Sequence, residues 1–324
     1  MRILLAYDAS EGAAVAARLV ERAAWPVGSS IELVTVIEPE LAELPVGPWP
    51  TPSAAATIAA EDDLARVLAA KAALDEVAER LRAHGLDALT VVLRGEARYV
   101  LVDRIERDRP DLVVTGSRHL GGLRRIVLGS ISSALVDRSP VPVLVARGDR
   151  LERVVVATDG SEIADEAIAT IARWPFLATT EIRVASVAAD HPSPWPSEMI
   201  PGIPPDALED VQTDAADRAE HERIANVAAD RLSAAGLAAR AQVLSGPAAA
   251  AITAFARDWG ADLVILGSHG RTGITRVVLG SVARDVLDNA VSSVLIVRRH
   301  AEPVGRPRVA ANPASAAIHS LATH

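Results

Sequence analysis

Short apolar runs alternate with longer amphipathic segments along most of the chain. Runs such as RILLAY near the start and RVVVAT from residue 153 are rich in Val, Ile and Leu, and their length is typical of buried strands. Each is followed by an alanine-rich stretch with helical spacing and then by a second apolar run, at 31–37 and at 181–187. This order predicts repeated strand–helix–strand units.

The whole pattern occurs twice, at a constant offset of 151 residues. Asp8 in AYDASE corresponds to Asp159 in ATDGSE, and Asp111 in PDLVVTGS corresponds to Asp262 in ADLVILGS. Because the register holds over most of the repeat, the chain contains a duplicated domain. Each copy predicts the order β-α-β-α-β-α-β-α-β, which implies an α/β fold with a doubly wound, parallel, five-stranded sheet and helices on both faces.

The repeat sets the expected domain boundaries. We place the first domain at 1–147 and the second at 153–299, with a short linker from Gly148 to Glu152. Residues 300–324 lack apolar periodicity, and we expect them to form a disordered tail.

Two proline-rich passages follow the second predicted strand of each copy, at 39–53 and 190–205. Their prolines exclude a continuing helix or a central strand. We interpret them as surface loops, with a flap over a ligand site or a pad against the sister domain as the alternative.

Composition narrows the class of protein. The chain has no Cys, which excludes disulfides and thiolate metal sites. Its first apolar run is too short for a signal peptide, and no stretch reaches the length of a transmembrane helix. The net charge is −9, and the arginines are scattered among acids, which disfavours nucleic acid as a partner. We therefore expect a cytoplasmic protein that binds neither membranes nor nucleic acid.

The second copy contains a glycine-rich loop where a parallel sheet binds its ligands, beyond the carboxyl end of a strand. Gly267 ends a predicted strand, Gly270 follows after two residues, and Gly280-Ser281 open a helix after nine more. Glycine lets backbone approach an anion, and a helix N-terminus offers unpaired N–H groups. Each glycine alone would indicate only a strand end or a helix cap, but the full spacing predicts a phosphate-binding loop.

This spacing, an Asp closing the first strand and a terminal apolar strand resemble the ATP-binding universal stress protein family, in a tandem two-domain form. The resemblance implies an adenine nucleotide alpha-hydrolase-like fold that binds ATP. It implies that Ala157 and Asp159 lie against adenine and ribose, that Val187 contacts the base, and that the loop residues hold ribose and phosphates. The loop residues are Gly267, Gly270, Gly280, Ser281 and Val282, and the counterparts in the first domain are Asp8, Val36, Gly116, Gly129, Ser130 and Ile131. The alternative role for Asp159 is a loop or N-cap acid before a helix beginning near Glu162.

The first copy departs from the pattern at one position, because His119 stands where the second glycine is expected. A side chain there would crowd the phosphates or require a positive φ, at a cost of about 1 kcal/mol. Two glycines that follow would let the loop adapt, and an imidazole is able to donate a hydrogen bond to phosphate. We expect weaker binding in the first domain, with abolished binding as the alternative.

The resemblance favours a regulatory or stress-response module in which ATP occupancy changes the surface offered to an unidentified protein partner. A slow ATPase or phosphotransfer enzyme is one alternative, but the chain has no Walker-type loop, its only lysine is Lys71, and we assign no catalytic residue. A scaffold without bound nucleotide is the other. The sequence lacks clustered metal ligands, so Mg²⁺ would arrive with the nucleotide.

The last apolar run of each copy, VPVLVAR and SVLIVRR, would be an exposed edge strand by itself. In the family this strand joins two domains, so the resemblance implies an internal pseudo-dimer. Ordinary edge strands shielded by their own loops are the alternative, and further association of two chains is left open.

Overall fold

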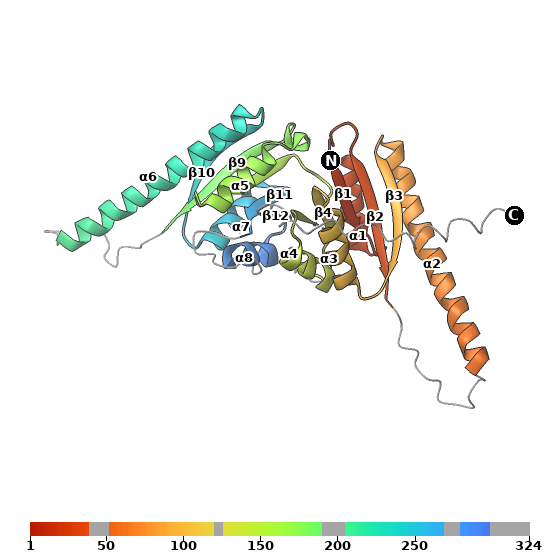
Figure 1. The fold of residues 1–324 in the computed structure, drawn as a ribbon. Helices are drawn as coiled ribbons and strands as arrows, with labels where there is room; N and C mark the ends of the chain where they lie inside the picture. Colours follow the sequence, from red (N-terminus) through yellow and green to blue (C-terminus); the bar gives the residue numbers. More distant parts are fainter. Residues whose placement is uncertain (39–51, 120–125, 190–204, 269–278, 299–324) are drawn as a thin grey trace, which may run out of the picture.

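The computed structural model describes residues 1–38, 52–119, 126–189, 205–268 and 279–298. Two α/β halves lie side by side and share one continuous sheet (Figure 1). The α/β class and the doubly wound repeat predicted from the sequence are confirmed. The expected tail and most of both proline-rich passages lie outside the described residues.

The first half alternates strands and helices, and its five main strands are parallel in the order β3-β2-β1-β4-β7. A two-stranded hairpin, β5–β6, is an addition that the sequence pattern did not indicate. The elements are β1 (Arg2–Ala6), α1 (Glu11–Arg22), β2 (Ser30–Ile37), α2 (Pro52–Ala83), β3 (Asp87–Arg94), α3 (Ala97–Asp108), β4 (Leu112–Gly116), β5 (Arg118–His119), β6 (Ile126–Val127), α4 (Ser130–Arg138) and β7 (Val143–Ala146).

The second half repeats this topology, with parallel strands in the order β10-β9-β8-β11-β12. Its elements are β8 (Arg153–Ala157), α5 (Glu162–Ile171), the short 3-10 helix η1 (Pro175–Leu177), β9 (Glu181–Ala188), α6 (Pro205–Ala234), β10 (Ala238–Ser245), α7 (Ala248–Trp259), β11 (Leu263–Gly267), α8 (Ser281–Asn289) and β12 (Ser293–Val297). Both α2 and α6 begin at a proline, which a first helical turn tolerates because its N–H groups have no helical acceptor.

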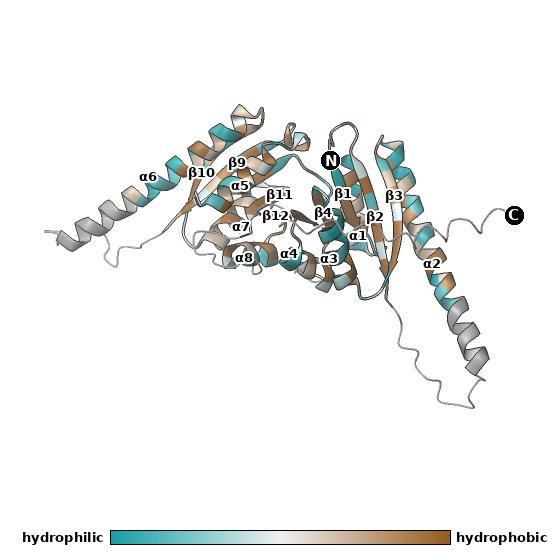
Figure 2. Cartoon of the chain, viewed as in Figure 1, coloured by the Kyte–Doolittle hydropathy of each residue, from teal (hydrophilic) through white to brown (hydrophobic). Residues whose placement is uncertain are grey.

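The hydrophobic core lies on both faces of the sheet. One face packs against α1, α2, α5 and α6, through residues such as Leu19, Leu74 and Leu232. The other face packs against α3, α4, α7 and α8, through residues such as Leu101 and Val286. Figure 2 shows the apolar colour along the central strands, as expected for parallel strands that are buried on both sides. Their continuous apolar runs therefore set the layers of the fold.

An antiparallel pairing of β7 with β12 joins the two halves into a ten-stranded sheet. We call this β7–β12 pairing the seam. Leu144 lies opposite Leu295, its own counterpart in the repeat, so a pseudo-twofold axis passes through the seam and relates the two halves. Each final strand thereby covers the edge of the other, as the resemblance implied. The sheet instead ends at β3 and β10, at opposite ends of the molecule (Figure 1).

Contacts on the two faces of the sheet reinforce the seam. On one face the ring centroids of Trp25 and Phe176, which occupy equivalent positions in the repeat, lie 4.6 Å apart. Trp174 stacks on Phe176 at 5.5 Å. On the other face, Arg284 of α8 pairs with Asp137 of α4. The halves therefore meet through backbone, aromatic and ionic contacts together.

Candidate functional site

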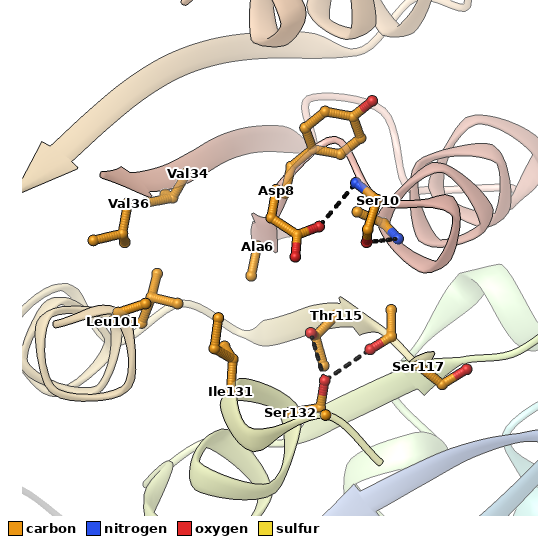
Figure 3. A pocket seen from close by; sticks show the side chains of 15 residues that line it. Ala6, Asp8, Ser10, Val34, Val36, Leu101, Thr115, Ser117, Ile131 and Ser132 are labelled. Atoms are coloured by element: carbon orange, nitrogen blue, oxygen red, sulfur yellow. Dashed lines mark hydrogen bonds between the residues drawn. The ribbon is translucent and has the colours of Figure 1, made fainter. Parts of the chain in front are cut away.

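A pocket lies at the carboxyl ends of β1, β2 and β4 in the first domain, beside the N-terminus of α4 (Figure 3). It holds about 550 Å³ of space, counted with its open mouth. The sequence predicted this edge of the sheet, because strand order reverses there. The apolar wall consists of Ala6, Val34, Val36, Leu101 and Ile131, and the polar wall includes Asp8, Ser10, Thr115, Ser117 and Ser132.

Asp8 and Ser10 form a short turn that leads from β1 into α1. The Ser10 amide donates to Asp8 Oδ1 over 3.0 Å, and the Ser10 hydroxyl accepts from the Ala13 amide over 3.2 Å. Ser10 is therefore the N-cap, and Asp8 closes the turn before it. Figure 3 shows the other oxygen of the Asp8 carboxylate turned toward the pocket.

The second domain repeats this turn. The Ser161 amide donates to Asp159 Oδ1 over 3.0 Å, and the Ser161 hydroxyl accepts from the Ala164 amide over 3.2 Å. Helix α5 begins at Glu162, where the sequence placed it. The N-cap is Ser161, so Asp159 is an acid of the turn and not the cap itself.

The turn after β1 contains a strained residue. Ala9 has a φ of 59°, whereas its counterpart Gly160 has a φ of 72°, which glycine adopts without a steric cost. We expect Ala9→Gly to raise the free energy of unfolding by about 0.5–1 kcal/mol, because relief of the left-handed strain exceeds the added chain entropy. Urea unfolding measures this effect. The reverse change, Gly160→Ala, should destabilise the protein. A loss of stability in Ala9→Gly would contradict the strain that we infer at Ala9.

Among the described residues that line the pocket, Asp8 carries the sole charge. Tyr7, beside it, is partly buried, and this burial raises the pKa of its phenol. The hydroxyl therefore stays protonated at neutral pH and is a hydrogen-bond donor. The counterpart in the second domain is Thr158, so the two sites differ at this position.

Hydrogen bonds fix the start of α4 against the end of β4. The Ser132 hydroxyl donates to the carbonyl of Gly116 over 2.7 Å and lies 3.2 Å from Thr115 Oγ1. The second domain has Leu266 and Ala283 at the positions of Thr115 and Ser132. This link was not predicted from the sequence, where its one signal is that Thr115 interrupts an otherwise apolar strand.

The second domain makes the corresponding connection through backbone. The Gly280 amide donates to the carbonyl of Ser268 over 2.8 Å, which joins the start of α8 to the end of β11. Ala157 ends β8 and pairs with Ala185 of β9, two residues before Val187. The second-domain residues implied by the resemblance thus meet at one edge of the sheet, except Gly270, which lies outside the described residues. Val282, in the first turn of α8, is 38% exposed.

Two glycines of the first domain allow a close approach of α1 to β4. A Cβ on Gly12 would lie 1.9 Å from the carbonyl oxygen of Ser117, and a Cβ on Gly116 would lie 2.2 Å from the backbone of Gly12. Gly116 therefore has a packing requirement in addition to its place at the pocket. The second domain has Ile163 in place of Gly12, so this requirement belongs to the first domain.

The position that breaks the glycine pattern has extended backbone. His119 pairs with Ile126 and Arg118 with Val127 in the antiparallel β5–β6 hairpin. A positive φ at His119, one of the two costs expected from the sequence, therefore does not arise. The remaining loop residues, 120–125 in the first domain and 269–278 in the second, lie outside the described residues.

No group of three or more His, Asp or Glu side chains in the described ranges is arranged to hold a metal ion. None of the helices in the same ranges is long and apolar enough to cross a bilayer.

The fold and the pocket define a duplicated α/β protein with a candidate ligand site at the carboxyl edge of each half-sheet. Two stretches, 1–147 and 150–298, match the model of the universal stress protein family. A universal stress protein of Mycolicibacterium smegmatis is 30% identical over 309 residues, which cover 91% of this chain and 96% of that protein. The chain therefore belongs to the universal stress protein family, with two such domains in tandem.

Further comparisons agree with this assignment. A universal stress protein of Mycobacterium tuberculosis is 31% identical over 199 residues, which cover 58% of this chain and 62% of that protein. The crystal structure of a universal stress protein from Archaeoglobus fulgidus aligns with a TM-score of 0.61 at 21% identity, covering 92% of this chain and 98% of that one. At this level of identity, the likeness to the Archaeoglobus fulgidus structure supports the fold alone.

Proposed function

We propose that this universal stress protein binds ATP at the carboxyl edges of its two half-sheets and acts as a nucleotide-dependent regulatory module. The observation that carries the proposal is the pocket of the first domain. It combines an apolar wall, a carboxylate and a helix N-terminus within one depression. These three chemistries suit the base, the ribose and the phosphates of a nucleotide, respectively.

The residues present fit such a ligand. Val36 and Leu101 face one another across the apolar part of the pocket (Figure 3), and they offer a base an apolar surface on which to pack. Asp8 offers an acceptor to ribose hydroxyls. Gly129 and Ser130 at the start of α4 offer backbone N–H groups and a hydroxyl to phosphate. When bound, ATP would supply the negative charge and its accompanying Mg²⁺.

We propose the second domain as the tighter site. It carries the uninterrupted glycine spacing, with Gly270 where the first domain has His119. The equivalent turn acid, Asp159, makes the same hydrogen bond as Asp8. The second loop itself lies outside the described residues, so this order of affinities rests on the sequence.

A regulatory role is favoured over catalysis. Phosphoryl transfer needs a cation on the phosphates and a group that orients the nucleophile. Asp8, the charged residue among the described lining, is an acid, and the proposal places it at the ribose and not at the phosphates. Steady release of ADP and phosphate by purified protein would instead support the slow ATPase. The protein partner and the cytoplasmic location remain predictions from the sequence.

A calorimetric titration of ATP tests the proposal. We expect the unmodified protein to bind ATP, with the tighter site in the second domain. Val187→Trp should abolish that site, because an indole would fill the position proposed for the base, and Val36→Trp should abolish the other site. The matched control is Val27→Trp, at a fully exposed valine outside the pocket, which should leave both sites intact. Thermal unfolding of each variant establishes that it is folded.

The outcomes separate the three functions. Loss of one site in each pocket variant would support two ATP sites at the predicted places. If the unmodified protein takes up no ATP and none co-purifies with it, the proposal of nucleotide binding is wrong. The alternative function, a scaffold without bound nucleotide, then takes its place. If binding occurs but survives in both pocket variants, the sites lie elsewhere.

A further inference from the structure

Two arginines reach across the seam between the domains. Arg147 follows β7 of the first domain, and Arg298 follows β12 of the second, at equivalent positions of the repeat. The guanidinium of Arg147 donates from Nη1 to the carbonyl of Ala290 and from Nη2 to the carbonyl of Leu287. Both carbonyls belong to the C-terminal end of α8, so the first domain caps the last helix of the second.

A reciprocal contact holds the counterpart helix, with a single guanidinium nitrogen as the donor. Arg298 Nη2 donates to the carbonyls of Val136 and Asp137, over 2.5 and 2.7 Å. These carbonyls lie in the last turn of α4, so the second domain caps the last helix of the first. Arg284 of α8 also pairs with Asp137, and α8 contacts the β6 strand of the first domain. The end of each helix is therefore held by the opposite half of the chain.

Arg147 is buried, Arg298 is partly buried, and both caps are charged. Arg147 is 7% exposed, and burial lowers the pKa of its guanidinium to about 10, so it remains a cation at neutral pH. Burial also lowers the pKa of Arg298. A cation at a helix C-terminus interacts favourably with the helix dipole, and two carbonyl acceptors offset part of its desolvation. Exposed salt bridges would hold the helices far less firmly.

The capped helices are those whose other ends reach the proposed nucleotide sites. Helix α4 has nine residues, so its N-terminus at the pocket and its capped end belong to one short rigid body. Helix α8 also has nine residues and begins at Gly280-Ser281. A shift of the capped end would therefore displace the N–H groups at the opposite end.

We propose that Arg298 and Arg147 are positioning residues for the nucleotide site of the opposite domain, so that each half of the chain completes the binding site of the other. This inference rests on the proposed function. It predicts a crossed effect: Arg298 acts on the site of the first domain, although Arg298 directly follows the last strand of the second domain.

The test isolates each site before the arginines are changed. In a Val187→Trp background the first-domain site remains, and Arg298→Met should weaken its ATP affinity at least roughly fivefold, whereas Arg147→Met should change it less than twofold. In a Val36→Trp background the second-domain site remains, and the order of the two effects should reverse. Arg150→Met, at an exposed arginine of the linker, is the matched control and should change neither site.

Lysine variants distinguish positioning from general stability. Arg298→Lys and Arg147→Lys keep the charge but replace the planar guanidinium by an ammonium, so each should restore part of the lost affinity. Thermal unfolding of all variants should show that they are folded at the temperature of the titration. A merely structural role would weaken both sites in parallel with the loss of stability.

Each outcome decides a separate point. Crossed losses with partial rescue by lysine support the inference. Losses confined to each arginine's own domain, equal losses at both sites or unchanged affinities overturn it and leave ATP binding standing. If only one site binds ATP, the crossed comparison at that site decides. If the unmodified protein binds no ATP, the proposed function fails and the inference fails with it.

Discussion

Leu295→Asp should destabilise the protein by about 3–5 kcal/mol, because it leaves an unpaired carboxylate in a core that offers no compensating partner. Leu295 is 1% exposed and lies opposite Leu144, also 1% exposed, at the centre of the β7–β12 pairing. The substitution disrupts the β7–β12 pairing that joins the two halves, so we expect the halves to unfold in separate transitions. Urea unfolding followed by fluorescence and by circular dichroism measures both effects.

The matched control for the seam is Val291→Asp. Val291 lies four residues before Leu295 and is 56% exposed, so the same carboxylate remains in water there. We expect a change within about 0.5 kcal/mol, the usual range for surface substitutions. Comparable destabilisation by both variants would show that the seam is not where the halves depend on one another.

Gly12→Ala should lower the free energy of unfolding by about 3 kcal/mol, near the upper end of the usual cost of overpacking. The new Cβ would lie 1.9 Å from the carbonyl oxygen of Ser117, and a backbone atom is unable to rotate away. Helix α1 must therefore move off the end of β4. Because Ser117 lines the pocket, we also expect weaker ATP binding in the first domain.

Gly148→Ala provides the comparison. A Cβ on Gly148 would meet no atom within 4 Å, so the added methyl group has space. Its effect should stay within about 0.5 kcal/mol, and denaturant unfolding of both variants under one set of conditions makes the comparison direct. Equal stabilities of the two variants would mean that α1 does not need the close approach.

Local pattern was sufficient to predict the repeat and the layers. Apolar runs such as that of β11 are buried on both faces, so their composition signals a parallel sheet without knowledge of their neighbours. The turn after the first strand of each half could also be predicted from the sequence, because an acid followed by Ser10 or Ser161 is typical of a helix start. The strand-end candidates Asp8 and Val36 came from the family resemblance, and their position agrees with the rule that ligands bind at the carboxyl edge.

Other parts of the site depend on contacts between distant segments. Leu101 lies on α3 and reaches the pocket only because that helix packs against β2, a placement that no local pattern reveals. The link from Ser132 to Gly116 is likewise a tertiary contact. The family spacing led us to expect crowding or a positive φ at His119. Its extended backbone instead depends on pairing with β6, which follows later in the chain.

By itself the sequence determined that this protein has two α/β halves, because hydrophobic periodicity and repeat register are properties of the chain alone. The family resemblance implied that the last strands join the halves, and the tertiary structure decided the register of that pairing and the contacts that support it. Leu144 meets Leu295, and Arg147 and Arg298 each cap a helix of the opposite half, across more than a hundred residues of sequence. Such contacts arise from the packing of two complete surfaces, which no local pattern encodes.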